Sequence, residues 1–99
     1  MLSEKDLKEW FSGLTREKIL IDNHARRRSR LRVFSEENIY SLLIEHPFKK
    51  IIKNKEDTNV PKFEVHYNHP HKKDENIVII FMPYNINEKI IKIVTVIIE

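Results

Sequence analysis

The hydrophobic pattern of this chain changes its period at Pro47, and that change limits the available folds more than any other feature. Before Pro47, apolar residues recur every three or four positions, as they do in helices. Over residues 63–68 they alternate with polar residues, which predicts a strand with one buried face. The runs at 77–82 and 90–98 are rich in isoleucine and valine and predict central strands, and 48–53 predicts another. Helices followed by strands indicate the α+β class.

The first half of the chain carries signals for helix ends. Ser3 and Asp6 have the spacing of a capping box, and one apolar stripe follows them. The members of that stripe are Leu7, Trp10, Phe11 and Leu14. Residues 19–21 predict a short strand or the start of the next helix, and Ser35 predicts the cap of a later one. We expect a single domain over residues 1–99, with about three helices on one face of a four-stranded or five-stranded antiparallel sheet.

Positive charge is concentrated in the stretch HARRRSRLR, residues 24–32, which holds five arginines and no acid. Its charge of +5 exceeds the chain's net +3, so the other residues sum to −2. A near-neutral body with one basic segment predicts a local anionic partner. On a helix, His24 and Arg28 share the side that faces the sheet, whereas other arginines stay free to contact phosphates. Those expected phosphate contacts are Arg26, Arg27 and Arg30.

Several classes of protein are disfavoured by composition. The chain has no cysteine, so it forms neither disulfides nor thiolate metal sites. The first residues lack the apolar stretch of a signal peptide, and the run at 77–82 is too short to span a bilayer. We therefore expect a cytoplasmic protein with no membrane contact. His66, His69 and His71 have poor spacing for zinc and predict a solvated hairpin tip, so we expect no metal and no cofactor.

The residues around the basic segment carry a family resemblance. Ile21-Asp22-Asn23-His24-Ala25, then Arg28, Arg32 and Phe34-Ser35, resemble the opening signature of the DUF4258 family, and Ile93-Val94-Thr95-Val96 resembles its closing strand. The resemblance covers residues 18–98, leaves 1–17 outside, and departs at Val33, where the family often has glycine. It implies a small α+β fold similar to RelE-like and barnase-like ribonucleases, many of which are toxins of toxin–antitoxin pairs.

Metal-free RNA cleavage requires a base for the ribose 2′-OH, an acid for the leaving oxygen and cations for the phosphorane. His24 titrates near neutral pH, and Arg28 and Arg32 offer planar donors to phosphate oxygens. The predicted sheet supplies candidates for the second proton-transfer group: Glu64, His66, Tyr67, Tyr84 and Thr95. These residues thus predict an endoribonuclease that acts on RNA, and the resemblance implies a toxin whose second partner is an acidic antitoxin protein.

Two other interpretations stay open at this point. The arginine segment is equally suited to a non-catalytic module that binds RNA, DNA or an acidic partner protein. Alternatively, its arginines have a structural role, in ion pairs with acids such as Glu36, Glu37 and Glu64.

Overall fold

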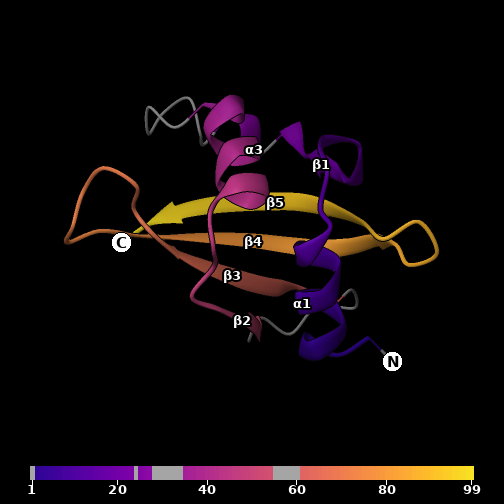
Figure 1. The fold of residues 1–99 in the computed structure, drawn as a ribbon. Coiled ribbons are helices and arrows are strands. Elements are labelled where there is room, and N and C mark those ends of the chain that lie inside the picture. Colours follow the sequence, from indigo (N-terminus) through magenta and orange to yellow (C-terminus); the bar gives the residue numbers. More distant parts are fainter. Residues whose placement is uncertain (1, 24, 28–34, 55–60) are drawn as a thin grey trace.

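The computed structural model describes residues 2–23, 25–27, 35–54 and 61–99, and these form an α+β fold (Figure 1). The helical elements are α1 (Glu4–Ser12), the 3-10 turn η1 (Arg16–Lys18) and α3 (Glu36–Glu45). The strands are β1 (Ile19–Ile21), β2 (Lys50–Lys53), β3 (Phe63–Asn68), β4 (Asn76–Asn85) and β5 (Ile90–Ile98). The α+β class and the strand at residues 19–21 are confirmed.

Within the described residues the sheet has five strands in the order β1-β5-β4-β3-β2. Strands β2 to β5 are antiparallel, as predicted, but β1 pairs parallel to β5. The prediction of a purely antiparallel sheet was therefore wrong. The reason is local: β1 comes from the helical half of the chain and has only three residues, so no hairpin fixes its direction.

Both helices begin where the sequence predicts. The Ser3 hydroxyl accepts from the Asp6 backbone N–H at 3.2 Å, and the Asp6 carboxylate accepts from the Ser3 backbone N–H at 2.9 Å. This is a complete capping box. At α3 the Ser35 hydroxyl accepts from the Asn38 backbone N–H at 3.2 Å. In the part of the chain that the structure describes, no helix is long and apolar enough to cross a membrane.

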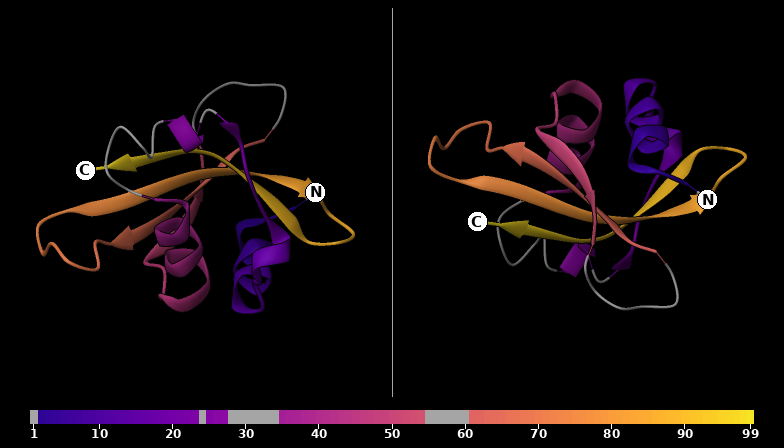
Figure 2. Two further views of the ribbon diagram at one scale, coloured as in Figure 1. Left: turned by 90° about the horizontal axis from the view of Figure 1, so that it is seen from above. Right: turned by 90° about the horizontal axis from the view of Figure 1, so that it is seen from below.

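Helices α1 and α3 lie side by side on one face of the sheet, and both views of Figure 2 leave the other face without them. Their apolar stripes bury a core with alternate residues of the strands, among them Val65, Phe81 and Ile93. Ala25, Arg26 and Arg27 have helical backbone, and we call them the arginine turn. Figures 1 and 2 place this turn at the outer edge of the sheet, next to β5. The expectation of three helices on one face thus holds only for α1 and α3.

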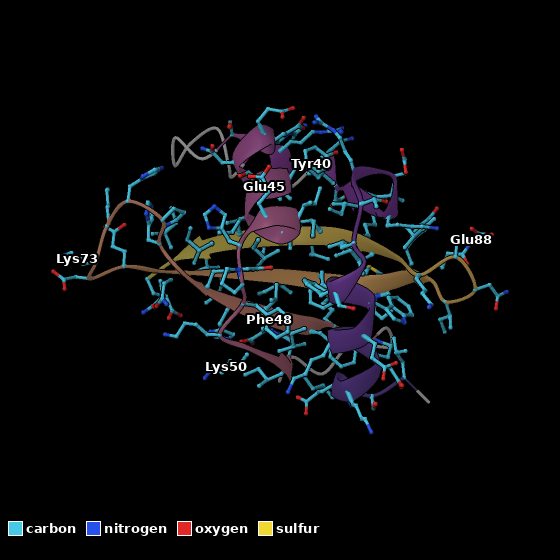
Figure 3. The ribbon with its side chains drawn as sticks, viewed as in Figure 1. Tyr40, Glu45, Phe48, Lys50, Lys73 and Glu88 are labelled. Carbon is cyan, nitrogen blue, oxygen red and sulfur yellow. The ribbon has the colours of Figure 1, made fainter. Side chains whose placement is uncertain are left out.

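The central strand β4 is longer than predicted. Pro83, Tyr84 and Asn85, which follow the run predicted at 77–82, extend the strand past an irregularity between Pro83 and Asn85 in its pairing with β5. A proline fits there because a bulge leaves a backbone N–H outside the ladder. The reversal follows at residues 86–89, where Lys89 adopts a φ of 58°. Figure 3 shows Glu88 at this end of the molecule and Lys73 at the opposite end.

The capping box makes a testable contribution to stability. Ser3→Ala should lower the free energy of unfolding by about 1 kcal/mol at neutral pH, because α1 loses its cap. The hydrogen bond from the Ser3 backbone N–H, followed by that from its hydroxyl, holds the pKa of Asp6 below its usual 3.8. This carboxylate therefore stabilises the fold above pH 3.8 and loses that effect as the pH falls through its lowered pKa.

Urea unfolding at pH 7 and at pH 2.5 measures this contribution, with Ser12→Ala at the other end of α1 as the control. We expect the difference in the free energy of unfolding between wild type and Ser3→Ala to be smaller at pH 2.5, because a protonated Asp6 no longer gains from the Ser3 hydroxyl. An unchanged difference would contradict the contribution of the carboxylate.

Candidate nucleic-acid interface

The sheet face turned away from α1 and α3, called here the second face, collects three of the predicted site residues. Pairing across the strands places Glu64 opposite Ile80 and Ile80 opposite Thr95. His66 lies one row along, opposite Val78, which lies opposite Ile97. Because directly paired residues project to the same side of a sheet, Glu64, His66 and Thr95 all point to the second face.

Glu64 and His66 form a hydrogen-bonded pair on this face. The His66 Nε2 atom lies 2.9 Å from Glu64 Oε1, and both side chains are partly buried, with 15% and 21% of their surface exposed. The Asn54 amide donates to the other carboxylate oxygen at 2.8 Å. An ionised carboxylate only accepts hydrogen bonds, so His66 donates through Nε2 and, when neutral, leaves a lone pair on Nδ1. The pair therefore offers an oriented imidazole that is able to accept a proton.

Thr95 owes its direction to an irregularity in β5. Ile93 and Val96 are both buried in the core although they are three positions apart, which strict alternation would not allow. The pairing of β4 with β5 shifts between Ile80 and Phe81, and this bulge restores Val96 to the core side. The Thr95 hydroxyl is buried and has no hydrogen-bond partner among the described residues. It lies two strands from Glu64, about 10 Å away at the usual strand spacing.

Two other sequence candidates are not brought to this pair. Tyr67 alternates onto the core side, where it is 1% exposed, and burial raises the pKa of its hydroxyl above the ordinary value. It is therefore a packing residue, separated from His66 by the sheet. Tyr84 lies near the end of β4, four residues beyond Ile80 and thus about 13 Å along the strand from the Glu64 row. Its ring lies beside Lys92 of β5, with which it lines a pocket next to β1.

The arginine turn begins where β1 ends. The Asp22 backbone N–H donates to the Ile93 carbonyl at 3.0 Å, and the Arg26 N–H donates to the Asp22 carbonyl at 3.1 Å. These bonds fix the turn against β5. Ala25 is fully buried, whereas Arg26 and Arg27 are exposed. The turn therefore presents its arginines to solvent at the rim of the sheet, as the helical pattern predicts for Arg26.

Arg26 and Arg27 differ in whether an acidic side chain is paired with them. Arg26 forms an ion pair with Glu36 at the start of α3. Arg27 has no ion-pair partner among the described residues, so it is the better phosphate contact of the two. The pairing of Arg26 supports a structural role for that residue. His24, Arg28, Arg30 and Arg32, the other predicted site residues of the segment, lie outside the described residues.

A second arginine cluster was not predicted from the sequence. Arg16 in η1 forms an ion pair with Glu37, and its guanidinium carbon lies 4.2 Å from the centroid of the Tyr40 ring. Hydrogen bonding to Arg16 lowers the pKa of Glu37, and the same bond raises the pKa of Arg16. Figure 3 labels Tyr40 on α3, near η1. Since Glu37 lies 21 positions after Arg16, no local spacing signals this pair.

The histidines of the β3–β4 connection do not join His66. His69 Nδ1 accepts from the backbone N–H groups of His71 and Lys72 at 3.0 and 3.2 Å, so its ring organises the turn. The rings of His69 and His71 meet edge to face at 6.2 Å. Among the residues described, no group of three or more histidine, cysteine, aspartate or glutamate side chains is placed to hold a metal ion.

Comparison with known proteins adds no constraint on this site. No protein-family model, no curated protein and no solved structure matches the chain. The resemblance to the DUF4258 family stays a prediction that depends on the residues quoted above.

The geometry of the pair predicts one tautomer for His66. At a pH where the ring is neutral, its proton should reside on Nε2, because Glu64 accepts there. Long-range proton–nitrogen NMR correlations of labelled protein distinguish the two ring nitrogens. Glu64→Ala should mix the tautomers, whereas Glu75→Ala, in the exposed connection, should not change them. A proton mainly on Nδ1 in the wild type would contradict the assigned bond.

Proposed function

We propose that this chain is a metal-independent endoribonuclease that binds single-stranded RNA across the second face of its sheet. The observation that supports this most is the Glu64–His66 pair, at 2.9 Å, on a face whose rim carries the arginine turn. An RNA strand that runs from β3 over Thr95 to the outer edge of β5 would meet both. The oriented imidazole supplies proton transfer and the arginines supply phosphate contacts.

The reaction that fits these groups is transfer of the phosphate to the neighbouring ribose hydroxyl. His66 Nδ1 removes the 2′-OH proton, the 2′ oxygen attacks phosphorus, and the bond from phosphorus to the 5′ oxygen breaks. An acid gives the leaving oxygen its proton, and we assign that role to His24. Arg28 and Arg32 stabilise the charge of the phosphorane through planar donors. The products are a 2′,3′-cyclic phosphate and a 5′-hydroxyl end.

Glu64 has a positioning role in this scheme. Its second carboxylate oxygen is held by Asn54 at 2.8 Å, so the carboxylate is itself fixed while it orients His66. Both side chains are mostly buried, so few water molecules reach them. The hydrogen bond between them is stronger for that reason. A proton-transfer residue held in this way is typical of catalytic imidazoles.

The family proposal extends the function to a biological role. The resemblance to DUF4258 supports a toxin that is neutralised by an acidic antitoxin protein bound over the arginine segment. Expression of the wild-type chain should then arrest growth, and either His24→Ala or His66→Ala should relieve the arrest. Coexpression of a small acidic protein encoded beside it should have the same effect.

Purified protein incubated with RNA in EDTA tests the chemistry. His66→Ala and His24→Ala should each slow cleavage by about 100- to 10,000-fold, because each removes a proton-transfer group. His71→Ala, which alters an exposed histidine at the end of the molecule, is the matched control and should cleave at the wild-type rate. The cleaved ends should carry a 2′,3′-cyclic phosphate.

Binding is measured separately from cleavage in the same samples. His66→Ala should keep its RNA affinity, whereas Arg27→Ala should weaken binding, and salt should weaken wild-type binding steeply. Wild-type cleavage by folded His66→Ala protein would remove the pair from the mechanism. RNA binding without cleavage by the wild type would establish the non-catalytic binding module instead.

A further inference from the structure

A pocket of about 310 Å³ lies beside β1, with Lys92 of β5 and Tyr84 of β4 in its lining. We call it the edge pocket. It is lined by residues from β1 to the arginine turn and by one residue each of α3, β4 and β5. The lining residues that a ligand would contact are Leu20, Asp22, Asn23, Arg26, Tyr84 and Lys92. Its volume is at the lower end of the range for small-molecule sites, and its lining mixes apolar and polar groups. Such a pocket is large enough for one nucleobase.

The lining places an exposed aromatic ring beside a cation. Tyr84 is 57% exposed, and the Lys92 ammonium lies 5.8 Å from the centroid of its ring. Leu20 is opposite Lys92 in the pairing of β1 with β5 and is 39% exposed, so it adds apolar surface. An exposed tyrosine next to a positive charge has the composition of a base-stacking site, where the ring holds the base and the cation holds phosphate.

Hydrogen-bonding groups face the same space from the end of β1. Asp22 is held by its backbone bond to Ile93, and its carboxylate lies 3.9 Å from the Lys92 ammonium, with 39% of the side chain exposed. The Asn23 amide oxygen accepts from Arg26 at 3.4 Å. A carboxylate accepts hydrogen bonds but donates none, so it favours bases that carry an exocyclic amino group. Adenine, cytosine and guanine have such a group and uracil does not.

From these contacts we propose that the edge pocket binds one amino-bearing base of a single-stranded RNA, with the base stacked on Tyr84 and its amino group donating to Asp22. The inference rests on the proposed function, since it assigns a base-recognition subsite to the same RNA. Arg26 lines the pocket and belongs to the arginine turn, so the RNA path is continuous from the rim into the pocket.

The pocket is distinct from the Glu64–His66 pair. His66 is aligned across the sheet with Val78 of β4 and Ile97 of β5. Lys92 comes five positions before Ile97, which corresponds to about 17 Å along β5. The bound base therefore lies well away from the Glu64–His66 pair, and in this proposal the pocket selects sequence rather than taking part in the chemistry.

Fluorescence anisotropy with labelled oligocytidine and oligouridine RNA tests the proposal, using the His66→Ala protein so that the probe stays intact. Tyr84→Ala should weaken oligocytidine binding by about 5- to 100-fold, the loss expected for one stacked base. Tyr84→Phe should bind like the parent, because the ring stacks without its hydroxyl. Ile86→Ala, which alters a neighbouring residue that is 64% exposed and outside the edge pocket, is the matched control and should also bind like the parent.

Base preference gives the second measurement. Oligocytidine should bind more tightly than oligouridine, and Asp22→Asn should reduce that difference, because an amide no longer offers two accepting oxygens. Unchanged oligocytidine binding in Tyr84→Ala would overturn the edge pocket while leaving the nuclease proposal in place. Base-dependent binding by a wild-type chain that does not cleave RNA would support the pocket and overturn the nuclease proposal.

Discussion

The requirement to cover β4 on both faces determines much of this structure. Ile77, Ile79 and Phe81 are fully buried on the side of α1 and α3, while Val78 and Ile80 are 3% and 8% exposed on the second face. A strand that is apolar on both sides must lie in the interior of a sheet. Strands β3 and β5 flank it, and the helices cover one side of it. Removing this apolar surface from water supplies the main driving force for folding.

The polar residues of the second face are placed by that same strand. Glu64 and His66 pair across to Ile80 and Val78, so the buried side chains of β4 support the carboxylate–imidazole pair from beside it. The Asn54 amide and the limited exposure of both partners then fix the pair in one arrangement. Catalytic geometry on a rigid strand is more precise than geometry on a loop, because packing locks the side-chain rotamers. In this account the fold positions the imidazole, and the arginine turn at the rim recruits the phosphates.

The sequence predicted the elements better than their arrangement. Alternation of polar and apolar residues was sufficient to place Glu64 and His66 on one face of a strand, and the capping signals located both helices. The parallel pairing of β1 could not be predicted, because three residues carry no signal for strand direction. The direction of Thr95 depends on a bulge that local alternation does not reveal. Arg26 pairs with Glu36, and Arg16 pairs with Glu37. Both ion pairs depend on where α3 packs on the sheet, and no spacing along the chain encodes that position.

The central claim is that RNA lies across the second face, and amide chemical-shift mapping tests it most directly. Labelled protein would be titrated with an RNA oligomer whose 2′-hydroxyls are methylated, so that it binds without being cleaved. We expect the largest shift changes at Glu64, His66 and Thr95 on the second face and at Arg27 on its rim, with little change at Lys8 in α1 or Glu45 in α3. Changes confined to α1 and α3, with the second face unaffected, would contradict the account.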